Sequence, residues 1–144
     1  MTRYLAIDLG DRRTGVAVGD DGTCLVTPLS VLEVPRGPAL DEAIARVVDE
    51  HAPDAIVVGL PLHMDGTEGD RAKISRAFGE GLAARTGVPV HYQDERLTSD
   101  AAETRLAQSG RTHKQKKAVR DAIAAAVILA DFLGPPPGAA TSGE

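Results

Sequence analysis

Three short segments, far apart in the chain, place carboxylates where an apolar run ends or begins. They centre on Asp8, on the adjacent pair Asp94 and Glu95, and on Asp121. Carboxylates that converge inside a protein repel one another and lose hydration, so a buried cluster is costly unless something neutralises it. The usual neutralising group is a hard divalent cation such as Mg²⁺ or Mn²⁺, which binds oxygen ligands. The sequence therefore predicts a metal-dependent enzyme that acts on phosphates, provided that the fold brings the three segments together.

Each of these acids also has a simpler interpretation. Asp8 lies between two apolar residues, which disfavours plain solvent exposure, but its carboxylate could cap the turn that follows. Glu95 competes with Asp94, because both lie past the regular alternation of the preceding strand. Asp121 lies near the start of a helix, where the helix dipole favours a carboxylate even on the surface. The residues alone leave these alternatives open.

A basic stretch leads directly into Asp121. Between residues 111 and 120 the chain carries no acid and these basic side chains: Arg111, Lys114, Lys116, Lys117 and Arg120. Such a run is usually a solvated helix face, but beside a metal site it would give a phosphate substrate a positive approach path. The net charge of −5 argues against a polybasic nucleic-acid binder, although it does not exclude a segregated basic patch.

Composition restricts the remaining classes. The 144 residues suit one domain with a sizeable core. Cys24 is the single cysteine, so we expect no internal disulfide and interpret Cys24 as a small core residue of a cytoplasmic protein. We find no membrane-spanning run, no signal peptide, and no motif of serine hydrolases, zinc proteases or nucleotide-binding loops. Aromatic residues make up only 3%, which disfavours base stacking as the main mode of binding.

The elements that must position these acids follow from the periodicity of the apolar residues. Strand-like runs, the first three forming an antiparallel meander, occupy residues 3–9, 16–18, 24–34, 55–59 and 88–92. Helical spacing occurs at 40–51, at 74–82 (with Ile74, Phe78 and Leu82 on one face), at 98–106 and at 115–132. This order predicts a mixed five-stranded α/β sheet flanked by helices, in a single domain over residues 1–133 with a disordered Pro/Gly-rich tail at 134–144. Asp8, Glu95 and the loop at 59–69 should then lie at one edge, if the fourth and fifth strands flank the first.

Four motifs in this order resemble the YqgF/RuvX family of bacterial RNase H-like proteins, described as pre-16S rRNA nucleases or Holliday junction resolvases. They are AIDLGDRRTGVAVGD (6–20), IVVGLPLHMDGTEG (56–69), DERLTS (94–99) and VRDAIAAAVIL (119–129). The resemblance extends from Arg3 to Leu133 and implies an RNase H-like fold, with Asp8, Glu95 and Asp121 as the acidic triad. It thereby favours Glu95 over Asp94. Further family motif positions are Arg13, Gly15, Gly59, Pro61 and Gly66.

The resemblance and the carboxylates together predict a metal-dependent nuclease. The triad would hold one or two Mg²⁺ or Mn²⁺ ions for in-line hydrolysis of a phosphodiester bond. The groups that would contact substrate phosphates are Arg13, Lys114, Lys116, Lys117 and Arg120. Processing of the 5′ end of pre-16S rRNA, with structured RNA rather than branched DNA as the substrate, is the preferred function.

Three other functions compete with this one. A Holliday junction resolvase would need a homodimer with two symmetric sites. A non-catalytic module for ribosome assembly would have no use for an intact triad. An actin-like or sugar-kinase ATPase would need two such domains to enclose its nucleotide.

Overall fold

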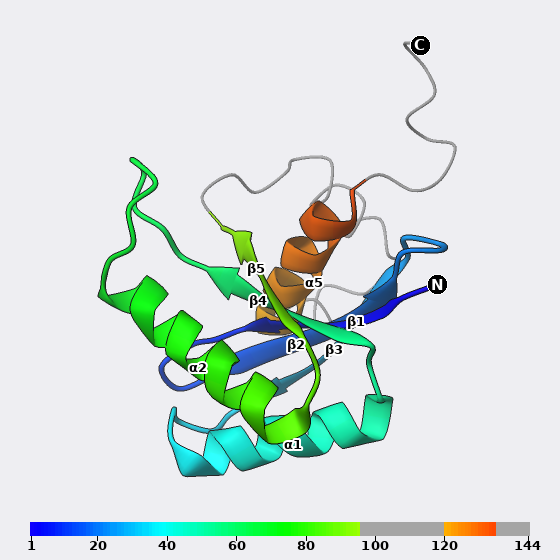
Figure 1. Cartoon of the computed structure of the whole chain (residues 1–144), viewed down its shortest axis with the longest axis horizontal. Helices are drawn as coiled ribbons and strands as arrows, with labels where there is room; N and C mark the ends of the chain where they lie inside the picture. Colours follow the sequence, from blue (N-terminus) through cyan, green and yellow to red (C-terminus); the bar gives the residue numbers. More distant parts are fainter. Residues whose placement is uncertain (96–119, 135–144) are drawn as a thin grey trace.

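The computed structural model describes residues 1–95 and 120–134, which form a five-stranded sheet with helices on both faces (Figure 1). The strand order is β3-β2-β1-β4-β5. The strands are β1 (Arg3–Asp8), β2 (Thr14–Asp20), β3 (Val26–Leu32), β4 (Ala55–Leu60) and β5 (Val90–Asp94). The mixed sheet predicted from the sequence is confirmed.

The first three strands form the expected antiparallel meander. β2 pairs with β1 from Arg3–Asp20 to Asp8–Gly15, and β3 pairs with the other side of β2. β3 begins at Val26, later than the predicted residue 24, because Cys24 has a positive φ of 56° and still belongs to the turn. The Cys24 side chain is buried, as expected for a small core residue.

The second half of the sheet is parallel, and each crossover passes through a helix. β4 pairs with β1 and β5 pairs with β4, both in parallel. The crossover helices are α1 (Pro38–His51) and α2 (Asp70–Thr86), which lie on the same face of the sheet in Figure 1. α1 buries Leu40, Ile44 and Val48, in agreement with the predicted helical spacing.

The predicted buried face of α2 is confirmed at Leu82, and Phe78 packs against the core, but Ile74 departs from the prediction. Ile74 is 37% exposed, whereas the buried residues are Ala72, Ser75, Gly79 and Leu82. Tyr92 on β5 lies against this helix, and its hydroxyl donates a hydrogen bond to Arg76 O at 3.1 Å. A Cβ at Gly79 would lie 2.5 Å from the Tyr92 hydroxyl oxygen, so this helix needs small residues where it crosses the sheet.

The opposite face of the sheet is covered by α5 (Arg120–Leu133). Small residues on both sides, among them Ala6, Ala17 and Ala125, are fully buried and allow close packing. The Phe132 ring contacts the Tyr4 ring with centroids 5.3 Å apart, so the end of α5 lies near the start of β1. Because Asp8 is at the other end of β1, the first residues of α5 lie at the same edge of the sheet as Asp8.

Several predictions fall outside the described residues, namely the helix at 98–106, the first residues of the helix at 115–132 and most of the tail at 134–144. At Gly134, α5 ends with a positive φ of 79° and an N–H that donates to Ala130 O at 3.0 Å. In the described ranges, none of the helices combines the length and apolar character needed to cross a membrane.

Candidate functional site

Asp8 lies in a gap between two glycines at the carboxyl end of β1. By strand alternation it shares the face of Ala6, which packs against α5. Its partner in β2 is Gly15. On the other side, the pairing of Ile7 with Val58 places Asp8 next to Gly59 of β4. Because both neighbouring residues are glycines, neither neighbouring strand presents a side chain of its own at the position next to Asp8.

Glu95 approaches Asp8 from the end of β5, which is two strands away from β1. In the sheet, β4 lies between β1 and β5. Glu95 follows β5 directly, and its N–H donates to Leu60 O at 3.2 Å. Its side chain lies over Gly59, where an added Cβ would be 2.8 Å from Glu95 Cδ and 2.9 Å from Oε2. Because Gly59 has no side chain, the Glu95 side chain can extend from the end of β5 to Asp8.

The two carboxylates interact strongly. The pKa of Glu95 is raised from 4.5 to about 7, first by burial, then by the negative charge of Asp8 and by a hydrogen bond with Asp8. The positive charge of Arg71 acts in the opposite direction. At neutral pH the metal-free pair is thus partly protonated, and a cation that binds both oxygens would remove the repulsion. A half-buried pair of carboxylates suits a hard divalent cation such as Mg²⁺ or Mn²⁺.

The third acid of the predicted triad is located only by its backbone. Asp121 is the second residue of α5, whose start lies at the edge that holds Asp8 and Glu95. The side chains of Asp121 and Arg120 lie outside the described residues. Among the described side chains, Asp8 and Glu95 come together, but no group of three or more His, Cys, Asp or Glu could hold a metal ion.

Of the predicted phosphate-binding residues, Arg13 is described and lies at the site. It lines an open hollow together with Asp8, Leu9, Gly10, Asp11, Arg12 and Arg71. Arg13 Nε also lies 3.9 Å from Glu33 Oε1, as an exposed ion pair. Of the other four, Lys114, Lys116 and Lys117 fall outside the described residues, as does the side chain of Arg120.

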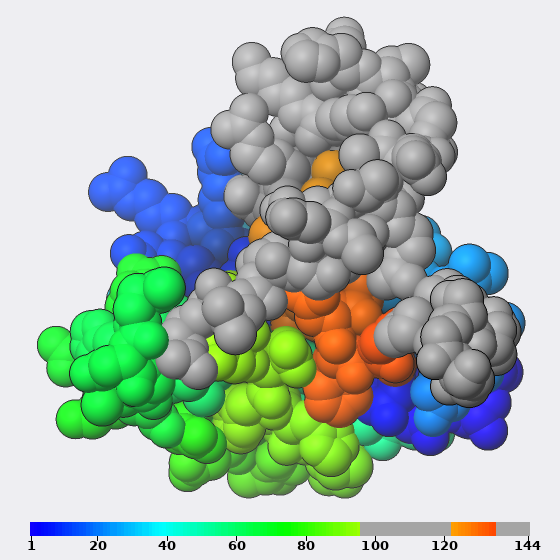
Figure 2. Space-filling view, turned by 90° about the horizontal axis from the view of Figure 1, so that it is seen from above, coloured from blue at the N-terminus to red at the C-terminus, as the bar shows by residue number. Residues whose placement is uncertain are grey.

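Sequence reasoning missed Arg71, which belongs to this hollow. It lies in the first turn of α2, after the glycine-containing loop that follows β4. In Figure 2 the blue segment after β1 and the green segment leading into α2 lie on the same side of the molecule. The sequence did place the loop at this edge of the sheet. However, nothing in its pattern distinguished Arg71 from the other exposed arginines.

Replacing Gly59 with Ala should destabilise the protein and displace Glu95. The new Cβ would lie 2.6 Å from Ile128 Cδ1 and 2.8 Å from Glu95 Cδ. We expect a loss of about 1–3 kcal/mol in the free energy of unfolding from overpacking, and about a hundredfold lower activity from the misplaced carboxylate. Chemical denaturation and a cleavage assay would measure the two effects.

Gly81→Ala is the matched control for this substitution. A Cβ at Gly81 meets nothing within 4 Å, and the residue is inside α2. It should therefore gain up to about 1 kcal/mol and keep full activity. If Gly59→Ala behaved like Gly81→Ala, the path of Glu95 over Gly59 would be wrong.

The sequence matches one protein family over nearly its whole length. A family model described as "RuvX: Holliday junction resolvase" matches residues 2–134. The chain is 41% identical over 136 residues to a protein of Dechloromonas aromatica, covering 94% of this chain and 93% of that protein. It is 46% identical over 131 residues to a protein of Anaeromyxobacter sp., covering 91% and 96%. Both relatives carry the name "Putative pre-16S rRNA nuclease".

Solved structures with the same fold are much more distant in sequence. Thermus thermophilus RuvC in complex with a Holliday junction substrate superimposes with a TM-score of 0.56 at 16% identity, covering 92% of this chain and 94% of that chain. The fowlpox virus Holliday junction resolvase gives a TM-score of 0.57 at 13% identity, covering 91% and 97%. These two similarities support the RNase H-like fold.

Proposed function

Because this chain belongs to the RuvX family, a family of nucleases, we propose that it hydrolyses phosphodiester bonds with a divalent metal ion, in processing the 5′ end of pre-16S rRNA. The observation that carries this proposal is the contact between the carboxylates of Asp8 and Glu95 at the carboxyl edge of the sheet. Such a pair is costly to keep in a protein that does not use it.

We assign Asp8, Glu95 and Asp121 as both the catalytic residues and the metal ligands. Asp8 and Glu95 supply oxygen donors beside Gly59, whose missing side chain leaves room for the Glu95 carboxylate. A bound Mg²⁺ or Mn²⁺, as one ion or two, would lower the pKa of the attacking water and stabilise the charge on the leaving oxygen. The position of the first turn of α5 supports Asp121 as the third ligand.

Binding of the substrate backbone is assigned to basic residues around this edge. Arg13 lines the hollow that contains Asp8, so a phosphate in the hollow could contact both its guanidinium and the bound metal. The basic run that precedes α5 would contact phosphates farther along the strand. It comprises Lys114, Lys116, Lys117 and Arg120. The proposal includes a single nuclease domain over residues 1–133 and a cytoplasmic location.

Structured RNA is the preferred substrate because the curated relatives at 41% and 46% identity carry the name of an rRNA nuclease. The second candidate is cleavage of a Holliday junction, which the description of the matching family favours. Resolution of a junction needs two symmetric cuts and therefore a two-fold dimer. Dimerisation on a four-way DNA junction would thus favour the second candidate.

Cleavage should require a divalent metal and should distinguish the two substrates. We expect the pure protein with Mn²⁺ or Mg²⁺ to cut a structured RNA faster than a single-stranded RNA or a four-way DNA junction of matched length. Ca²⁺ should bind without supporting rapid turnover, since its longer and looser coordination misplaces the attacking water. Full activity in excess EDTA would contradict the metal-dependent nuclease, and faster cutting of the junction would favour the resolvase.

A further inference from the structure

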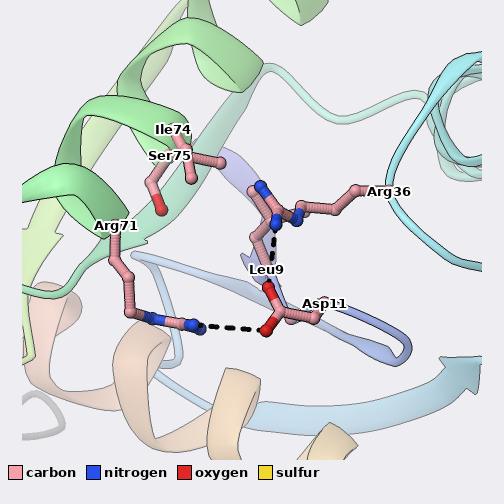
Figure 3. Close-up of a pocket in the computed structure, with 7 residues that line it drawn as sticks. Leu9, Asp11, Arg36, Arg71, Ile74 and Ser75 are labelled. Carbon is pink, nitrogen blue, oxygen red and sulfur yellow. Dashed lines mark hydrogen bonds and ion pairs between the residues drawn. The ribbon is translucent and has the colours of Figure 1, made fainter.

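Three charged side chains from separate segments meet beside the carboxylate pair. Asp11 follows β1, Arg36 precedes α1, and Arg71 lies in the first turn of α2. Figure 3 shows the Asp11 carboxylate between the two guanidinium groups. Arg36 Nη2 lies 2.9 Å from Asp11 Oδ1, whereas Arg71 Nη1 lies 3.5 Å from Asp11 Oδ2. Asp11 therefore bridges two arginines that come from separate segments of the chain.

The two halves of this bridge differ in strength. The Arg36 N–H also donates to Asp11 O at 3.2 Å, so main chain and side chain both join Arg36 to Asp11. Arg71 has the single longer contact, and its side chain is 61% exposed beside an Asp11 side chain that is 62% exposed. An exposed ion pair of this kind contributes at most about 1 kcal/mol. The contact between Arg71 and Asp11 can therefore be exchanged for another at little cost.

Arg71 is placed where its charge acts on the carboxylate pair. It lines the open hollow that contains Asp8, and also a smaller recess together with Arg36 and Ser75. Its positive charge lowers the pKa of Glu95, against the effects of burial and of Asp8. Arg71 is thus a cation within electrostatic reach of both acids.

A nucleic-acid strand needs such a cation at this place. Phosphates are repelled by a carboxylate pair and by a protein with a net charge of −5. The guanidinium group has a planar fork of N–H donors that matches phosphate oxygens. Resting on the proposed nuclease function, we propose that Arg71 binds a backbone phosphate of the substrate strand beside the carboxylate pair. Asp11 holds the Arg71 guanidinium at the hollow until this phosphate replaces the Asp11 carboxylate.

A set of charge variants with a matched control tests the proposal. Arg71→Ala removes the phosphate ligand, and Asp11→Asn removes the carboxylate that competes with the phosphate. The control pair is Arg46 and Glu42 on α1, an exposed ion pair with Arg46 Nη2 3.3 Å from Glu42 Oε1. Arg46→Ala and Glu42→Gln make the same charge changes within α1. The probe is a short fluorescein-labelled single-stranded RNA, whose binding is followed by anisotropy in EDTA over a range of KCl concentrations.

The two site variants should act in opposite directions. Arg71→Ala should weaken binding about tenfold at low salt and flatten the slope of log K against log salt by about 0.7 units, the value for one phosphate contact on a single strand. Asp11→Asn should tighten binding about threefold, as expected when a weak competing ion pair is removed. This tightening should vanish in the double variant that also carries Arg71→Ala. Both control variants should change binding by less than about twofold.

Equal effects of Arg71→Ala and Arg46→Ala would overturn the proposal, as would tightening by Asp11→Asn that persists in the double variant. If Arg71→Ala fails to fold in a thermal melt, Arg71→Lys takes its place. It keeps the charge but loses the fork, so it should weaken binding without changing the salt slope. Cleavage by the wild type in Mn²⁺ distinguishes a failure of this inference from a failure of the proposed function. A wild type that cuts and binds while the variants match their controls contradicts this inference alone, whereas one that neither binds nor cuts contradicts the proposed function and this inference with it.

Discussion

Replacing Asp8 with Asn is expected to abolish cleavage and also to raise the melting temperature of the metal-free protein. Loss of a group outside the ligand shell typically costs about 10–100-fold in metalloenzymes, so loss of a ligand should cost about a thousandfold or more. The metal-free protein is strained because the charge of Asp8 opposes ionisation of the half-buried Glu95. An amide of nearly the same shape removes this repulsion, and its NH₂ group can donate a hydrogen bond to the ionised Glu95.

The gain in stability should be about 1–2 kcal/mol, or a few degrees in melting temperature for a domain of this size. It should be measured at pH 8 in EDTA, where Glu95 is mostly ionised in the wild type. Added Mn²⁺ should stabilise the wild type more than the Asp8→Asn variant, because a ligand that binds only the folded state stabilises by mass action. Lost activity together with a lower metal-free melting temperature would mean that Asp8 holds the fold through its hydrogen bonds. The metal site would then be wrong.

The sheet and the position of Asp8 were predictable because they depend on local patterns. Apolar runs, turn residues and helical spacing determine where the strands and crossover helices lie, and parallel strands bring their carboxyl ends to one edge. Asp8, as the last residue of β1, followed directly. The helical spacing at 115–132 likewise predicted α5, in which Ala122 and Ala125 are fully buried.

The features that were missed depend on contacts between distant segments. Strand order cannot be read from periodicity, so the separation of β5 from β1 by β4, and with it the role of Gly59, required the structure. In α2, Ile74 was wrongly expected on the buried face, and the close approach of Tyr92 to Gly79 joins elements whose contact the sequence does not reveal. Arg71 looks like an ordinary surface arginine until its contact with Asp11 and its effect on Glu95 are known.

The choice between Glu95 and Asp94, which the residues alone left open, can be decided by a matched pair of variants. Glu95→Gln should lower cleavage about a thousandfold or more, since it removes a ligand. Asp94→Asn should stay within a few-fold of the wild type. The structure supports a larger effect for Glu95→Gln than for Asp94→Asn. Glu95 lies over Gly59 next to Asp8, whereas Asp94 is the weakest of the influences on the pKa of Glu95.

The Glu95→Gln and Asp94→Asn variants should also differ in how their free energy of unfolding depends on pH. The pKa of Glu95 is raised from 4.5 to about 7 in the folded protein, so between these values the folded state binds more protons than the unfolded state. The free energy of unfolding must then fall as pH rises from about 4.5 to 7, and this contribution levels off above 7. The shift corresponds to about 3 kcal/mol at most, and we expect about 1–2 kcal/mol because the site is partly open to solvent.

Melting curves in EDTA at pH 5 and pH 8 would measure this contribution for the wild type and both variants. The destabilisation between the two pH values should shrink in Glu95→Gln, which has no proton to lose at this position, and should persist in Asp94→Asn. Mn²⁺ should restore stability to the wild type mainly at pH 8, because the metal competes with the proton for the same oxygens. If instead Asp94→Asn removed the pH dependence and the activity, Asp94 would be the ligand, and the contact of Glu95 with Asp8 would have no part in catalysis.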